Sequence, residues 1–182
     1  ATVRLGMHQV TEITVAICVK SAVADQKSPL ALQIWAHALA TASYARLICV
    51  HRRRHVESAF LCGLLHSVGK LVLLKAVPDT TDPRLLDRHP LVGAAAARMW
   101  NLPESVIDAI THHQSFAQAP QYAEEAATTW LALRLAHEVV PIGSLDGIED
   151  DPVLEFLNIY PDELAVLRGN AEQVLKTVAA FR

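Results

Sequence analysis

Cysteine is scarce in this chain, and its pattern already excludes several classes of protein. Cys18, Cys49 and Cys62 are odd in number and contain no Cys-x-x-Cys pair. A disulfide scaffold and a cysteine-based zinc site are therefore excluded, and a reducing cytoplasm is the expected compartment. Aromatic residues are also few, at 5%. Because alanine and leucine dominate instead, the composition favours helices over a β-rich fold.

Three further features are absent. No run of about 18 apolar residues is free of charge, so we expect no membrane span and no membrane partner. The first ten residues lack a basic segment followed by an apolar one, so no signal peptide is expected. The net charge of −3 argues against a general nucleic-acid binder, and neither DNA nor RNA is an expected partner.

What is present is a large apolar fraction, 52% of 182 residues, arranged with a helical period. This pattern predicts one all-α domain. Segment 10–22 fits a strand or a helix, and we expect a helix because the rest is helical. We expect a loop at residues 143–152, a solvent-exposed connection that contains four acidic residues. The other expected helices cover residues 29–50, 56–77, 91–100, 103–113, 123–140 and 161–182.

Histidine is the unusual residue of this sequence, with nine copies, several in apolar helical stretches. Four of the expected helices each carry at least one, and His89 lies at the opening of a fifth. Neutral imidazole binds zinc, iron, nickel and manganese well, so a cluster of these rings is compatible with a metal by ligand type. The histidines concerned are His37, His66, His89, His112 with His113, and His137.

Several short motifs occur in an order that matches a known family. The segment from Glu57 to Lys70, ESAFLCGLLHSVGK, is similar to an E-x-A-F-x-x-G-L-L-H-D-I-G-K signature. It is followed by HPLVGA from His89, by WNLP and ITHH between residues 100 and 113, and by LAH ending at His137. The ordered set resembles HDOD domains, the output-type relatives of the HD phosphohydrolases. The resemblance implies a compact multi-helix HD-like bundle and a role in bacterial signalling.

The resemblance also suggests how the chain is divided. We expect residues 1–142 to form the HDOD-type helical domain. Residues 143–182 should form an acidic loop and a C-terminal helical extension packed on the same domain. HDOD domains usually carry further helices before the position of Leu5-Gly6. The chain therefore begins inside the domain or diverges there, and the stretch between Val77 and Leu91 is short for the family.

Two departures from the family pattern decide the expected chemistry. Ser67 follows His66 where the family has the aspartate of its His-Asp pair, and His137 holds the later aspartate position. The resemblance implies that these two aspartates hold the metal. A serine hydroxyl is a poor neutral ligand, and histidine does not bridge two cations as a carboxylate does. A two-metal hydrolase is therefore not expected.

Two interpretations of the histidines remain. The first is that they are core residues, hydrogen-bonded to one another, to Ser67 or to buried water, with no cofactor. The second is a single transition-metal ion, such as zinc, held by His37, His66, His112 and His137. In that case Asp108, four residues before His112, would orient its ring from behind. Consecutive histidines point about 100° apart, so His112 and His113 should not both face one centre. We expect the first interpretation.

Two basic features have alternative interpretations as well. The run from His51 to His55, HRRRH, suits phosphate or an acidic partner, but a solvated turn between helices is the simpler interpretation. Lys70 lies one turn after His66, where it reaches an anion in the same pocket or extends out to solvent.

The functional expectation is a non-catalytic, HDOD-type regulatory or output module in bacterial signal transduction, acting through a protein partner. One alternative is a metal-dependent phosphohydrolase of the HD superfamily acting on a nucleotide or cyclic dinucleotide. Another is a sensor that binds a nucleotide without cleaving it. No catalytic residue is assigned.

Overall fold

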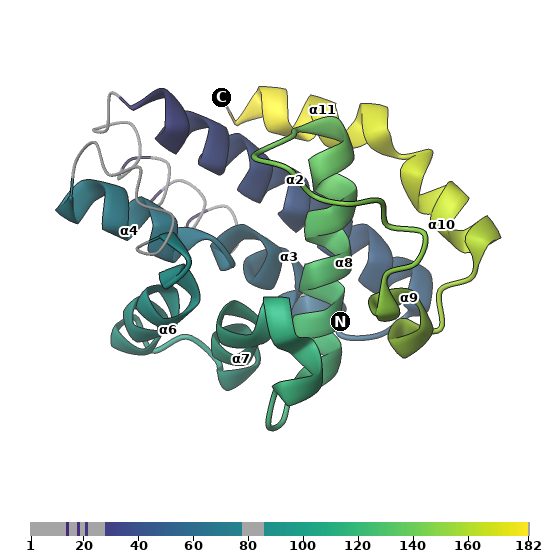
Figure 1. The fold of residues 1–182 in the computed structure, drawn as a ribbon, viewed down its shortest axis with the longest axis horizontal. Coiled ribbons are helices and arrows are strands. Elements are labelled where there is room, and N and C mark those ends of the chain that lie inside the picture. Colours follow the sequence, from purple (N-terminus) through teal and green to yellow (C-terminus); the bar gives the residue numbers. More distant parts are fainter. Residues whose placement is uncertain (1–13, 15–17, 19–20, 22–27, 78–85, 182) are drawn as a thin grey trace.

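The computed structural model describes residues 14, 18, 21, 28–77 and 86–181. All regular structure in these residues is helical, which confirms the expected all-α fold (Figure 1). The expected helix at 10–22 falls, apart from three isolated positions, outside the described residues, as do Leu5-Gly6 and most of the stretch between Val77 and Leu91.

Three helices form the centre of the bundle: α2 (Pro29–Arg52), α3 (Val56–Leu65) and α8 (Ala123–Val139). Both α3 and α8 pack along α2, which is buried on nearly every side. Small residues allow this close approach. A Cβ added to Gly63 would lie 2.6 Å from the Cα of Ala42, so the backbones of α2 and α3 are in direct contact.

The single helix expected over 56–77 is wrong, because the chain forms two helices there. α3 ends at Leu65, and α4 (Val68–Ala76) starts after a break at Ser67, where φ is −105° and ψ is 9°. Gly63 contacts α2, while a Cβ on Gly69 would lie 2.0 Å from the carbonyl oxygen of His89. On one straight helix these glycines would point about 120° apart. The break allows each of them to meet a different neighbour.

A second layer lies below α3 and α4 in Figure 1 and consists of α6 (His89–Met99), α7 (Glu104–His112) and the 3-10 helix η1 (His113–Gln118). α6 packs on α4 and α7, and it begins two residues before the expected start. The expected helix 103–113 changes to the tighter 3-10 geometry after its last α-helical residue, His112. This change fixes which way the following side chains point.

The C-terminal part contains three short helices, α9 (Pro152–Leu157), α10 (Pro161–Arg168) and α11 (Ala171–Ala180). α9 packs on α8, and α11 packs along α2 (Figure 1). The single helix expected over 161–182 is interrupted at Gly169 and Asn170, and α9 was not expected. The acidic loop is solvated at Asp146, Glu149 and Asp150, as expected, but the expectation is wrong for Asp151, whose side chain is only 9% exposed.

One stretch, Val56–Ala76, is apolar enough to cross a membrane by length and composition. It spans α3, the break and α4, and 78% of its most apolar window is buried inside the bundle. This burial is consistent with the core helix of a soluble protein.

Candidate functional site: a chain of histidine rings beside a small cavity

Five histidine side chains from five segments form a continuous series of ring contacts, here called the histidine chain. The ring centroids of His89 and His113 are 5.4 Å apart, and those of His113 and His66 are also 5.4 Å apart. The series continues from His66 to His37 at 5.9 Å and from His37 to His137 at 6.3 Å. α6, η1, α2 and α8 and the end of α3 therefore converge on one polar line through the core.

From the sequence we expected His112 in this cluster, and the structure places His113 there instead. His113 is fully buried against His66, whereas His112 is partly exposed. The reason is the end of α7, because His112 closes the α-helix and His113 opens the 3-10 helix. His89 also belongs to the chain and was missing from the expected ligand set, although its position at the start of an apolar helix was a usable signal.

Hydrogen bonds determine the tautomer of three rings. His66, His89 and His113 each donate from Nδ1 to the carbonyl oxygen three residues earlier, at 2.7, 2.9 and 2.9 Å. In the neutral ring Nδ1 then carries the proton and Nε2 carries the lone pair. The Nε2 atoms of His89 and His113 are buried and have no hydrogen-bond partner among the described residues. The rings of His89 and His113 are thus held at Nδ1 and have no described partner at Nε2.

Burial keeps these rings neutral. It lowers the pKa of His37 and of His89 to about 3 and the pKa of His113 to about 4, and the nearby charge of Lys70 acts in the same direction. The pKa of His66 is well below its ordinary value, first because of burial and then because of its neighbours His113 and His37. At neutral pH the four rings of His37, His66, His89 and His113 are therefore uncharged imidazoles.

A divalent metal pair does not fit these residues. Of the two positions where the family motif has aspartate, Ser67 offers a neutral hydroxyl, and Nδ1 of His137 accepts a hydrogen bond from the backbone N–H of Ile142 at 3.3 Å. Within the described part of the chain, no group of three or more His, Cys, Asp or Glu side chains is placed to hold a metal ion. Each ring of the histidine chain contacts at most two of the others, whereas a single ion needs its ligands around one point.

The hydrogen bond that the structure gives to Asp108 is with a backbone group rather than with His112. Its carboxylate Oδ2 accepts a hydrogen bond from the backbone N–H of Tyr122 at 3.2 Å, which links α7 to the start of α8. His112, the ring it was expected to orient, lies outside the histidine chain. Asp108 is therefore a structural link between two helices.

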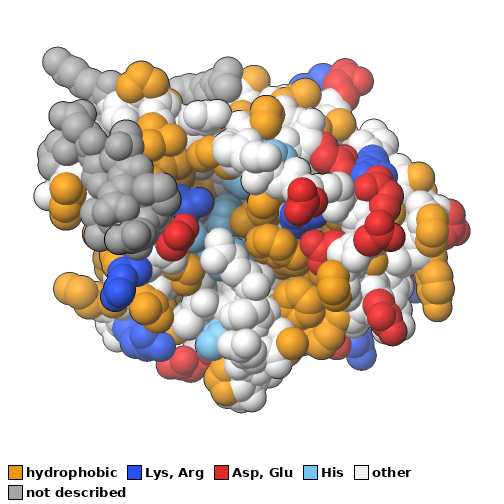
Figure 2. Space-filling view, in the orientation of Figure 1, with side chains coloured by type: hydrophobic (Ala, Val, Ile, Leu, Met, Phe, Trp, Pro, Cys, Tyr) orange, Lys and Arg blue, Asp and Glu red, His pale blue; other side chains and the backbone are white. Residues whose placement is uncertain are grey.

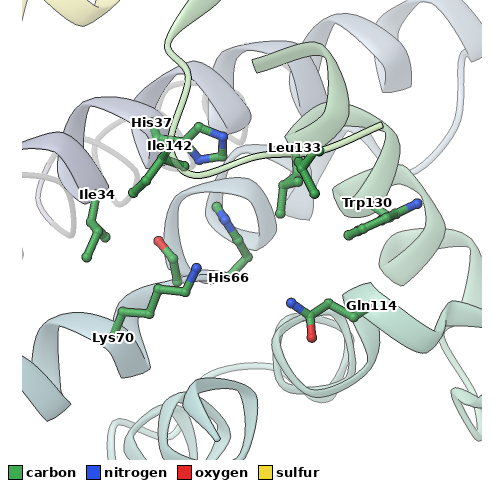
Figure 3. A pocket seen from close by; sticks show the side chains of 10 residues that line it. Ile34, His37, His66, Lys70, Gln114, Trp130, Leu133 and Ile142 are labelled. Carbon is green, nitrogen blue, oxygen red and sulfur yellow. The ribbon is translucent and has the colours of Figure 1, made fainter. Parts of the chain in front are cut away.

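A cavity of about 110 Å³ lies beside the histidine chain (Figure 3). Figure 2 shows the corresponding hollow near the middle of one face, with histidine side chains at its bottom. No acidic side chain is among the described residues that line it. These residues are Ile34, His37, His66, Ser67, Lys70, Gln114, Trp130, Leu133, Ile142 and Leu145.

The basic run from His51 to His55 is paired within the molecule. Arg54 lies 2.7 Å from Glu124, and His55 lies 3.1 Å from Glu125 at the start of α8. His51 contacts Glu163 of α10 at 3.0 Å. These acidic partners join the turn after α2 to two other helices, so the run is neither a free phosphate site nor a fully solvated turn.

The fold and site define an all-helical bundle with a histidine-lined cavity between its central helices. Residues 1–86 match the HDOD domain family, so the resemblance drawn from the motifs is confirmed and this part of the chain is HDOD-domain sequence. An uncharacterized protein of Treponema pallidum is 30% identical over 68% of this chain and 26% of its own length. The chain therefore spans about a quarter of that relative.

Solved structures share the fold. An HDOD domain protein of unknown function from Geobacter sulfurreducens superposes with a TM-score of 0.68 at 21% identity, over 93% of this chain and 68% of its own. A Marinobacter aquaeolei protein named for signal transduction gives a TM-score of 0.64 at 18% identity, over 81% of this chain and 37% of its own. A Shewanella amazonensis protein named as a phosphohydrolase gives a TM-score of 0.64 at 24% identity, over 97% of this chain and 71% of its own.

Proposed function

We propose that this chain is a non-catalytic, HDOD-type regulatory module of bacterial signal transduction that works in the cytoplasm through protein interaction. The observation that carries the proposal is the donor set of the cavity. Ser67 and His137 occupy the two positions where the family motif has aspartate, and no acidic side chain is among the described lining residues. The signalling context is supported by the name of the similar Marinobacter protein.

The chemical reason concerns charge. Hydrolysis by two metal ions needs both cations held close together, and carboxylates offset their mutual repulsion. Neutral imidazoles and one hydroxyl do not supply that negative charge. Lys70, which also lines the cavity, adds a positive charge instead. The donor set therefore argues against the phosphohydrolase alternative.

Protein interaction is supported by one face of α6. Leu91, Ala95 and Met99 follow one another at intervals of four residues and are all exposed, Met99 to 82%. Trp100 directly after the helix is 50% exposed. Residues four apart lie on one side of a helix, so this is a continuous apolar stripe of the kind that binds partners.

The test is hydrolysis. We expect no phosphodiesterase or phosphatase turnover above background when the purified chain is supplied with manganese, iron or magnesium. Substrates should include a cyclic dinucleotide and a phosphomonoester. Turnover by the unmodified protein that is abolished in His66→Ala would overturn the non-catalytic proposal.

A double variant provides the matched control. Ser67→Asp combined with His137→Asp returns a carboxylate to both positions, and we expect it to bind manganese more tightly than the parent, as measured by titration calorimetry. Equal and tight manganese binding by the parent would contradict the argument from donor chemistry.

A further inference from the structure

Two buried polar atoms face the cavity without a partner. Ser67 is 3% exposed, and its Oγ has no hydrogen-bond partner among the described residues. His37, also 3% exposed, has an unpartnered Nε2. Both residues line the cavity. Buried polar groups are normally satisfied, so two unsatisfied ones at one cavity point to a polar ligand that completes them.

The charge around the cavity favours an anion. Lys70 extends from α4 with its amino end toward His66, while His37 lies on the other side of that ring (Figure 3). Burial lowers the pKa of Lys70, and the nearby carboxylate of Asp87 opposes that shift. No acidic side chain is among the described lining residues, so the ammonium group has no carboxylate partner inside the cavity.

The start of α4 adds to this field. Ser67 is the N-cap residue of α4, a helix of nine residues, and its side chain makes no capping hydrogen bond. A helix N-terminus carries partial positive charge and attracts anions. The hydroxyl of Ser67, which makes no capping hydrogen bond, therefore lies at the N-terminal end of α4, where the helix dipole favours a bound anion.

We propose that the cavity binds one small oxyanion, the size of a single phosphate group, without a metal ion. Lys70 supplies the charge, the Ser67 hydroxyl donates a hydrogen bond, and His37 donates from Nε2 in the tautomer that places its proton there. Gln114 lines the opposite side of the cavity (Figure 3) and offers an amide donor.

The size of the cavity limits the ligand. At about 110 Å³ it is well below the roughly 300–1,000 Å³ of pockets that enclose whole drug-sized molecules. Free phosphate fits such a volume, as does the terminal phosphate of a larger molecule whose remainder stays outside. A buried cyclic dinucleotide does not. This ligand site goes beyond the proposed interaction role and is independent of whether the chain hydrolyses anything.

The experiment is a thermal-shift titration with inorganic phosphate, against sodium chloride at equal ionic strength. We expect phosphate to raise the Tm of the parent by a few degrees and chloride to leave it unchanged. The shift should disappear in Lys70→Met and persist in Lys75→Met, which removes an exposed lysine from the same helix. Lys70→Arg should retain most of it.

Ser67→Ala gives a second test that does not depend on the folding of the lysine variant, and we expect its phosphate affinity by calorimetry to fall about tenfold. AMP at the same concentration should shift the Tm no more than phosphate, because its nucleoside remains outside. A larger shift with AMP alone would overturn the small-anion assignment. Absence of a phosphate shift, or a shift that survives in Lys70→Met, would also overturn it. None of these results depends on turnover, so the non-catalytic proposal is tested separately.

Discussion

At the scale of single residues, this protein is defined by histidines that are buried and uncharged. In His66, His89 and His113 the Nδ1 atom is hydrogen-bonded to a carbonyl oxygen of the preceding turn, and this bond orients the ring. Charging any one of them would place an imidazolium among other imidazoles and near Lys70, with no carboxylate among the described cavity residues. The folded state therefore resists protonation much more than the unfolded chain does.

This resistance predicts a pH-dependent stability. The pKa of an unfolded histidine is about 6.5, whereas burial lowers the pKa of folded His113 to about 4. The unfolded state thus holds more protons in this window, so the free energy of unfolding should fall as the pH drops from about 6.5 toward 4. Each such histidine contributes a slope of about 1.4 kcal/mol per pH unit at most. Urea unfolding at pH 7.5, 6 and 5 measures it.

His113→Gln should reduce that slope by the contribution of one histidine, at most about 1.4 kcal/mol per pH unit. His112→Gln is the matched control because its ring is partly exposed. The control shows how much of any change comes from replacing a histidine of this segment by glutamine. Equal slopes for the parent and His113→Gln would contradict the assignment of His113 as a neutral core residue.

At the scale of elements, two glycines decide how the helices meet. Gly63 lets α3 rest on the backbone of α2, and Gly69 lets α4 rest on the start of α6. Both contacts involve backbone atoms, which move less easily than the ends of side chains. The break at Ser67 lies between them, and it also places Ser67 and Lys70 at the cavity.

Gly69→Ala should therefore be strongly destabilising. Its Cβ would lie 2.0 Å from the carbonyl oxygen of His89, so α4 and α6 must separate. We expect a loss of about 3 kcal/mol in the free energy of unfolding, measured by urea denaturation. Gly147→Ala is the control, because its Cβ meets only the end of the Glu149 side chain, and its effect should stay within about 0.5 kcal/mol. Similar stabilities for the two variants would contradict this packing argument.

At the scale of the whole molecule, the C-terminal helices are joined to the bundle by a buried polar cluster on α8. Arg134 donates from Nη2 to the carbonyl oxygens of Asp146 and Gly147 at 2.7 and 2.6 Å. Its Nε lies 3.3 Å from the carboxylate of Asp151, which also accepts from Nε1 of Trp130 at 2.9 Å. The loop between α8 and α9 is therefore held in place by Arg134 and Asp151, although most of its other side chains are exposed.

Asp151→Ala should test this connection. Besides Arg134 and Trp130, the carboxylate accepts from the backbone N–H of Val153 and so caps α9. Its removal leaves a guanidinium that is only 7% exposed without its carboxylate, and we expect a loss of about 3 kcal/mol in the free energy of unfolding. Asp150→Ala, at an exposed neighbour, should change stability by no more than about 0.5 kcal/mol. Chemical denaturation followed by tryptophan fluorescence compares the two, and equal losses would show that the cluster does not connect these parts.

The sequence by itself determined the helical class, the positions of most helices and the family. Apolar spacing is a local property, so it predicts helices such as α2 and α8 without knowledge of their neighbours. The order of the motifs around His66, His89 and His137 predicted HDOD-type sequence, and the match over residues 1–86 confirms the family. The non-catalytic proposal rests on the residues at positions 67 and 137. These inferences need only the identity of residues along the chain.

Only the tertiary structure decided which side chains meet. The choice of His113 over His112 depends on the residue at which α7 becomes a 3-10 helix, and a shift of one residue turns a side chain by about 100°. The break at Ser67 depends on contacts of Gly63 and Gly69 with two different helices. The burial of Asp151 depends on Arg134, 17 positions earlier, reaching it from α8. Each is set by packing between segments distant in sequence, which a local pattern does not contain.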